Sequence, residues 1–307
     1  MKKMMIAIAM VMMAMGANAQ TLIKAAYSKG DVVNYEIKST STHARPTGGS
    51  IETTITYNAK YSVLDASEEG YVIEAILSNL NTTGPEEATE AVTQVLKPLM
   101  DIPVTFITDA NGAPQKIKDF AELEKKHKDA IDAFVDDIFK SHAGQTLPLD
   151  IDNLKDFLKS KITEESELTA ITGNLFEFNG QTITNGEEVE KVKEGIKVKS
   201  VYNVTPILGT TVITEKENAN MTEEETKAMI LQTMRDSGAG EDQIKMLEDN
   251  WSQFVAAGMA KIDEEGNNTY RLLKNGWIQS GDENKVTKAM GSESKSTSSV
   301  KLTDKNF

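Results

Sequence analysis

The sequence predicts an α+β fold in which a curved antiparallel β-sheet, a half-barrel, carries helices packed across one face or mouth. Three observations lead to this prediction. Apolar and polar residues alternate over long stretches toward both ends of the chain, helical periodicity is confined to two segments, and no regular β-α-β succession joins them. We expect a single α+β domain over residues 20–307, with helical inserts near 119–171 and 222–255.

The first nineteen residues have the layout of a secretory signal peptide. Lys2 and Lys3 precede an apolar stretch over residues 4–15, and Ala17-Asn18-Ala19 forms a small-residue cleavage site. The apolar stretch is too short to span a bilayer, and no later segment approaches the ~20 apolar residues of a transmembrane helix. We therefore expect residues 1–19 to be removed and the remainder to be exported as a soluble periplasmic or extracellular protein without a transmembrane segment.

Composition narrows the classes of partner and anchor. The chain contains no cysteine, so disulfides are excluded. Lipid attachment at a bacterial signal peptide needs a cysteine at the position that Gln20 occupies, so we expect no lipid anchor. The formal net charge is −14, and it becomes −16 once Lys2 and Lys3 are removed. Such an acidic surface repels phosphate backbones and anionic headgroups, so nucleic acid is not an expected partner.

The first part of the mature chain has the period of two that is typical of half-buried strands. Strands are expected over 33–37, 51–63, 71–80, 104–108 and 114–118. The 71–80 segment is apolar on both faces, which indicates a strand covered on both sides, with a helix as the expected cover. A short helix is predicted over 86–97, and Asn111-Gly112 predicts a hairpin turn.

The period then changes to that of a helix. Asp119 is the expected N-cap of a helix that runs through Phe139, and another over 154–162 continues brokenly toward 171. A capping box at Thr222–Glu225 opens a helix that ends at 238–240, and a further helix is expected over 244–255. The remaining strands are predicted over 175–178, 196–206, 208–217, 258–263, 270–273, 277–280, 286–290 and 294–302, with turns at 264–267, 275–276 and 281–282.

The sequence contains no motif that indicates catalysis, a metal or a cofactor. His43, His127 and His142 lack metal-ligand spacing; we expect His127 to be a packed, hydrogen-bonded ring and His142 to complement a helix C-terminus. Glu124, Asp129, Asp132 and Asp136 are expected to form a solvated helix face. No nucleophile elbow, phosphate loop or dinucleotide fingerprint is present, so we expect neither an enzyme nor a cofactor.

Methionine and aromatic side chains on the predicted helices are the one feature that points to a ligand. They are Phe134, Phe139, Phe157, Met229, Met234, Trp251 and Phe254. Such side chains suit an adaptable pocket for a lipid-like or other apolar small molecule, although ordinary core packing between helix and sheet is the preferred explanation. Two hypotheses stay open: a binding module for an apolar or amphipathic ligand, and a structural or interaction protein of the cell envelope. A third hypothesis is a hydrolase with a site assembled from dispersed acids, for instance Asp129 or Asp136.

Four segments resemble an uncharacterised family of exported Bacteroidetes proteins, a domain of unknown function. They are Tyr27–Tyr35 after the signal, Tyr61–Asp65, Phe106–Pro114 and Tyr270–Trp277. The layout also resembles the LolA-like lipoprotein-carrier architecture, a curved antiparallel half-barrel that encloses an apolar cavity under helices. This resemblance implies an apolar ligand bound by a diffuse lining, and it assigns no functional residues.

Overall fold

The computed structural model describes residues 20–44, 49–86, 88–89, 93, 96–97, 100–141, 151–193, 196–236, 240–289 and 291–307. The predicted signal peptide, His142 and half of the predicted helix over 86–97 lie outside the described residues. So do Gly238 and Ala239 of the predicted helix break.

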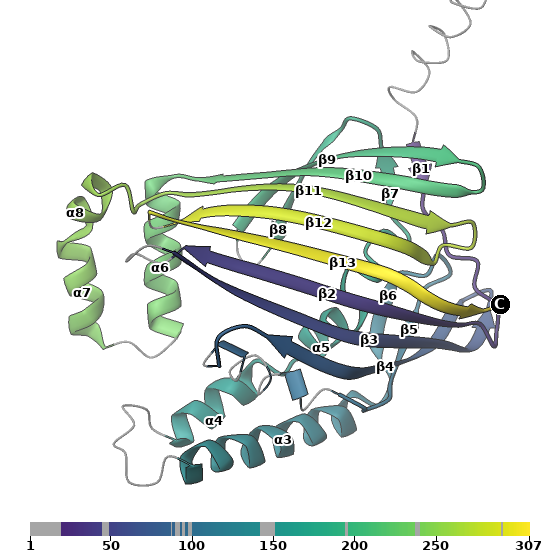
Figure 1. Ribbon diagram of the computed structural model, residues 1–307, viewed down its shortest axis with the longest axis horizontal. Helices are drawn as coiled ribbons and strands as arrows, with labels where there is room; N and C mark the ends of the chain where they lie inside the picture. Colours follow the sequence, from purple (N-terminus) through teal and green to yellow (C-terminus); the bar gives the residue numbers. More distant parts are fainter. Residues whose placement is uncertain are drawn as a thin grey trace, which may run out of the picture.

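In the described part of the chain, eleven strands form one antiparallel sheet (Figure 1). Their order across the sheet is β6-β5-β4-β3-β2-β13-β12-β11-β10-β9-β8, so the sheet is open, with β6 and β8 at its edges. The strands are β2 (Val32–Ala44), β3 (Ser50–Ser67), β4 (Gly70–Thr83), β5 (Val104–Thr108), β6 (Pro114–Ile117), β8 (Glu188–Lys193), β9 (Ile196–Ile207), β10 (Thr210–Met221), β11 (Ile262–Leu273), β12 (Ile278–Ala289) and β13 (Ser292–Asn306). The predicted α+β class is confirmed.

The remaining elements lie around this sheet. A separate two-stranded sheet pairs β1 (Gln20–Leu22) with β7 (Thr182–Thr184). The helical elements are α3 (Phe120–Ser141), α4 (Ile151–Ser160), α5 (Glu164–Thr172), the 3-10 turn η2 (Gly173–Leu175), α6 (Glu223–Asp236), α7 (Glu241–Asp249) and α8 (Trp251–Ala256). Figure 1 shows α6, α7 and α8 together at one end of the sheet, whereas α3 and α4 lie beside β4. The helices therefore form two separate groups.

One face of the sheet, here called the inner face, carries the core. Along β10 and β11, alternate residues such as Ile213 and Tyr270 are buried, while the residues between them are exposed. The same alternation holds in β4, where Ile73 and Ala75 are buried but Val72 and Ile76 are only half-buried. The prediction that this strand is buried on both faces is therefore wrong, because the second face is only partly covered and carries Glu74 and Ser78 among its apolar residues.

The N-terminal arm, residues 20–31, completes the core on the inner face. The Tyr27 ring stacks on Trp277 with 4.0 Å between ring centroids, and Asn179 Nδ2 donates to the Tyr27 hydroxyl at 2.9 Å. Backbone hydrogen bonds join the arm to three separate loops: Ala25 N to Asn111 O, Ala26 N to Asn275 O, and Gly180 N to Ile23 O. The arm therefore ties together loops that are distant in sequence.

Two hairpin glycines allow this close approach. A Cβ on Gly112 would lie 2.4 Å from the Ala25 Cβ, and one on Gly276 would lie 3.0 Å from the Ala25 Cα. Both glycines also have positive φ, at 90° and 91°. The turns predicted at Asn111-Gly112 and Asn275-Gly276 are confirmed, and their glycines serve packing as well as backbone conformation.

Two other predicted turns are wrong. Gly266 and Gly281 lie inside β11 and β12, so the predicted meander of short strands is three long ones. These two positions are glycine because the inner face is closely packed there and leaves no room for a side chain. A Cβ on Gly281 would lie 2.9 Å from Cδ1 of Tyr270, and one on Gly266 would lie 2.9 Å from Oε2 of Glu217.

The predicted strand over 175–178 is also wrong. Its residues belong to η2 and the turns that follow, where Asn179 N donates to Phe176 O and Gln181 N to Phe178 O. Phe176 and Phe178 are both buried, Phe176 against Trp277 and Phe178 against Tyr270. Their apolar spacing reflects core packing of a compact turn rather than an extended chain.

The acidic helix face has specific partners as well as solvent. Lys155 Nζ lies 2.6 Å from Oδ1 of Asp136, and Lys159 Nζ lies 2.5 Å from Oδ1 of Asp132. These ion pairs join α3 to α4, whereas Asp129 is exposed. Two members of the predicted solvated face therefore help to position a helix.

The arm yields a testable prediction. Tyr27→Ala removes a buried ring from the aromatic cluster and should lower the free energy of unfolding by about 3–5 kcal/mol. Tyr27→Phe keeps the stack and loses only the Asn179 hydrogen bond, so it should cost about 1 kcal/mol. Urea denaturation followed by tryptophan fluorescence measures both. Equal effects of the two substitutions would show that the ring stack is unimportant.

Candidate functional site

The structure divides the predicted ligand-lining residues between the two helical groups. Phe134 and Phe139 are half-buried on α3, and Phe157 belongs to α4, where only its backbone is described. The other four are half-buried at the opposite group: Met229 and Met234 on α6, Trp251 and Phe254 on α8. Whether any of them contacts a ligand stays a prediction.

A groove of about 850 Å³ lies between α6 and the adjacent ends of β8, β9 and β10. Its apolar part is formed by Met221, Ala228 and Met229. Lining residues from the strands and from the rest of α6 are polar: Glu190, Lys197, Lys199, Asn218, Asn220, Glu225, Gln232 and Thr233. We call this feature the α6 groove. Its lining is amphipathic, which suits a ligand with both apolar and polar parts.

The local sequence explains why α6 begins here. Thr222 and Glu225 form the predicted capping box: Glu225 N donates to Thr222 Oγ1 at 3.2 Å, and Thr222 N donates to Glu225 Oε2 at 2.9 Å. The backbone and hydroxyl hydrogen bonds from Thr222 lower the pKa of Glu225, and the charge on Lys197 adds to this effect. The capping box therefore anchors the first turn of α6 at the end of β10.

The helices beyond α6 form a small apolar layer. Leu231 of α6 and Ile244 of α7 are buried. On α8, the rings of Trp251 and Phe254 stack with 6.1 Å between centroids, and the Lys227 ammonium of α6 lies 5.8 Å from the centroid of the Trp251 ring. Met229, rather than these rings, is the predicted residue that lines the α6 groove.

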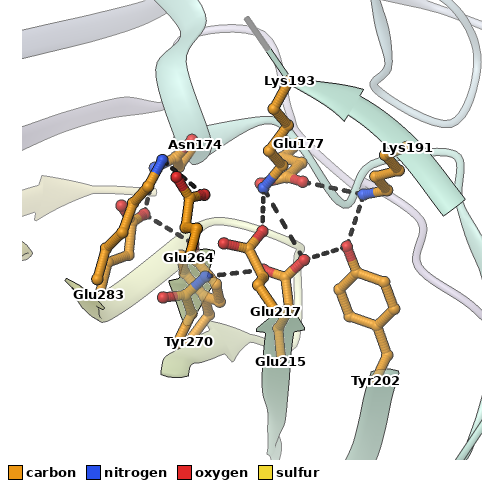
Figure 2. Close-up of polar contacts among 12 residues, drawn as sticks. Asn174, Glu177, Lys191, Lys193, Tyr202, Glu215, Glu217, Glu264, Tyr270 and Glu283 are labelled. Carbon is orange, nitrogen blue, oxygen red and sulfur yellow. Dashed lines mark hydrogen bonds and ion pairs between the residues drawn. The ribbon is translucent and has the colours of Figure 1, made fainter. Parts of the chain in front are cut away.

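A second feature, a cluster of buried charges on the inner face, was not predicted from the sequence. Figure 2 shows it around Glu215 and Glu217 of β10, which both approach Lys193 of β8. Glu215 also accepts hydrogen bonds from the Tyr202 hydroxyl and from Asn268 Nδ2. Lys191 Nζ lies 3.1 Å from Glu177 Oε1 and donates to the Tyr202 hydroxyl. We call this set the glutamate cluster.

The glutamate cluster extends along β11 and β12. The Tyr270 hydroxyl donates to Glu283 Oε1 at 2.7 Å, and Asn174 of η2 donates to the same oxygen. Lys285 Nζ lies 2.7 Å from Glu264 Oε1. Because Asn174 and Glu177 come from the segment that crosses the inner face, the cluster fastens that segment to the sheet.

The pKa values of the carboxyl groups in the glutamate cluster shift in different directions. Burial raises the pKa of Glu283. The nearby charge on Glu177 adds to this increase, and the hydrogen bonds from Tyr270 and Asn174 oppose it. Burial and repulsion by Glu215 likewise raise the pKa of Glu217. Burial disfavours the charge on Glu215 too, but Lys193 and the donated hydrogen bonds outweigh it and lower the pKa of Glu215.

A sequence signal for the cluster existed but was ambiguous. Glu215 and Glu217 alternate with Thr214 and Lys216, so polar residues occupy both faces of β10 and no period of two is visible there. Ile213 and Ala219, which lie before and after this stretch at the same alternate positions, are buried on the same face as the two glutamates. These two apolar residues are the only clue in the sequence that Glu215 and Glu217 point inward.

His127 is packed as predicted, but the predicted hydrogen bond is not formed at its Nδ1 atom. Its ring is buried, and Nδ1 lies 3.0 Å from Oε2 of Glu167 on α5, beside Ala75 and Ile171.

Among the residues that the structure describes, no group of three or more histidine, aspartate or glutamate side chains is arranged to hold a metal ion. No helix within these residues combines the length and apolar character needed to cross a bilayer.

Comparisons with known proteins leave the family open. No protein-family model and no curated protein matches the chain. A solved structure of lipid–protein interactions in lipovitellin aligns over 92% of this chain and 26% of its own, with 10% identity and a TM-score of 0.43. An outer membrane channel from Pseudomonas putida F1 aligns over 91% of this chain and 97% of its own, with 6% identity and a TM-score of 0.21. The chain thus spans about a quarter of the lipovitellin chain, and neither likeness is close enough to indicate a function.

The raised pKa of Glu283 gives a pH-dependent prediction. A carboxyl group whose pKa is raised by folding binds more protons in the folded state, so its cost to stability grows as the pH rises above its ordinary value near 4.5. Glu283→Gln removes this cost and keeps the acceptor oxygen. The variant should therefore be more stable than the wild type by about 1 kcal/mol at pH 7.5, and the difference should shrink toward pH 5.

Thermal unfolding of both proteins across this pH range measures the difference. Glu265→Gln, at an exposed position of the neighbouring strand, is the matched control and should show a difference that does not vary with pH. A destabilised Glu283→Gln variant at pH 7.5 would mean that the charge itself is needed to hold Asn174 and Tyr270.

Proposed function

We propose that this protein is an exported binding module for an amphipathic ligand, which it holds in the α6 groove. The observation that carries the proposal is the combination, in one groove of about 850 Å³, of an apolar floor with a polar strand wall. The volume falls in the range of small-molecule sites, and methionine side chains adapt to flexible apolar ligands. The signal-peptide layout supports a periplasmic or extracellular location, and the absence of a catalytic motif supports binding rather than catalysis.

The groove, and not the aromatic core, is the site we favour. The aromatic side chains of the inner face are occupied with one another and with the N-terminal arm, as in the contacts of Tyr27 with Trp277 and Phe176. A ligand there would have to displace the arm. The α6 groove is open on one side and needs no such rearrangement.

Binding of a neutral apolar dye tests this proposal. N-phenyl-1-naphthylamine should bind with increased fluorescence, and 1-dodecanol should displace it. Met229→Asp places a charge on the apolar floor and should weaken dye binding by at least about tenfold, since burying an unpaired carboxylate is costly. Met246→Asp, at an exposed position on α7, is the matched control and should bind normally. Equal binding by both variants would contradict the proposed site.

One observation favours a second candidate, an interaction protein of the cell envelope. Residues 203–214, the tip half of the β9–β10 hairpin, contain no charged side chain, although 26% of the whole chain is charged. At its tip, Leu208 is fully exposed and has a φ of 41°, and Gly209 follows with a φ of 84°. Such a turn favours Asn-Gly, so a leucine there is strained without a packing reason. An exposed apolar tip of this kind suits contact with a partner protein.

Leu208→Asn separates the two candidates. Asparagine tolerates positive φ, so the variant should be more stable by about 1 kcal/mol, which thermal unfolding measures. If the tip contacts a partner, the variant should lose the crosslinks that the wild type forms in its own cell envelope, while dye binding in the α6 groove stays unchanged. Unchanged crosslinking would remove the support for this candidate.

A further inference from the structure

We propose that the ligand of the α6 groove carries an anionic head group, a carboxylate or a phosphate, which binds at Lys197. This inference rests on the proposed function, because it names the class of amphiphile that the same groove takes. The inference is based on which of the charged residues that line the groove already have a partner in the protein.

Two of the four charged lining residues, Lys199 and Glu225, have partners in the protein. Lys199 Nζ lies 2.9 Å from Oε1 of Glu188. Glu190 is the cross-strand neighbour of Lys199, and its charge helps to raise the pKa of Lys199. Glu225 accepts the two hydrogen bonds from Thr222 that cap α6.

Lys197 is the second cation of the groove. It is exposed on β9, on the same side of the strand as Lys199, and it lines the groove. Within the described chain, no carboxylate lies at ion-pair distance from its ammonium. Its positive charge contributes to the lowered pKa of Glu225, but the two groups form no ion pair. Although the net charge of the whole chain disfavours anions, a ligand oxyanion at this position would give Lys197 the local partner that the described residues do not supply.

The rest of the groove fits an amphiphile placed in this way. Asn218 of β10 pairs with Lys199 across the strands, so its side chain lies in the same polar wall and can donate a hydrogen bond to an oxyanion. Met221, Ala228 and Met229 lie on the apolar side, where an alkyl chain would lose its contact with water. Head and tail thus have separate surfaces within one groove.

Competition between dodecyl amphiphiles tests the inference on the full mature chain. Dodecanoate, dodecyl phosphate, 1-dodecanol and dodecyltrimethylammonium are each used to displace N-phenyl-1-naphthylamine at concentrations below micelle formation. At least one of the two anions should bind about fivefold more tightly than 1-dodecanol, and the comparison between them identifies the oxyanion. Lys197→Gln should abolish this preference and leave the affinity for 1-dodecanol unchanged.

Lys216→Gln is the matched control, because Lys216 is exposed on β10 but does not line the groove, and it should keep the preference. Equal binding of anions and alcohol by the wild type, or a preference that persists in Lys197→Gln, would overturn the inference and leave the proposed function intact. Tighter binding of the ammonium amphiphile would overturn it in favour of Glu190. If neither the dye nor any amphiphile binds, the proposed function itself fails.

Discussion

The stacking of Tyr27 on Trp277 is the contact on which the arrangement of the inner face depends. Tyr27 belongs to the N-terminal arm, and Trp277 follows the turn between β11 and β12, so the stack joins the first described segment to the far half of the sheet. The arm also hydrogen-bonds to loops around Asn111, Gly180 and Asn275. A short segment with little regular structure of its own therefore sets the spacing between several longer elements.

The two polar features of the protein have different roles. In the glutamate cluster, Lys193 lies among Glu215, Glu217 and Glu177, and each charge has a partner within the cluster, so it fastens η2 and the following turns to the sheet. In the α6 groove, polar side chains face an opening, and Lys197 has no carboxylate partner among the described residues. Buried, mutually satisfied charges stabilise one arrangement of the chain, whereas exposed and unsatisfied ones are available to a ligand.

Much of the sheet could be predicted because its alternation is a local property. Strands β3, β4, β9 and β10, the capping box at Thr222 and the two Asn-Gly turns all follow from neighbouring residues. Gly266 and Gly281 were misinterpreted because their contacts with Glu217 and Tyr270 come from an adjacent strand, and a single sequence does not show that pairing. The same limit applies to the site. Met229 could be recognised on an apolar stripe, but Lys197 becomes distinctive only when its neighbours across the strands are known.

The position of β13 has a consequence for the order in which the protein can fold. This last strand pairs with β12 on one side and with β2 on the other, so it joins the beginning of the chain to its end. Until residues 292–306 have emerged, the two halves of the sheet present unpaired edges to each other and cannot join. Contacts so distant in sequence slow folding. The strand over residues 292–306 therefore supplies both hydrogen-bonded edges by which the two halves of the sheet are held together.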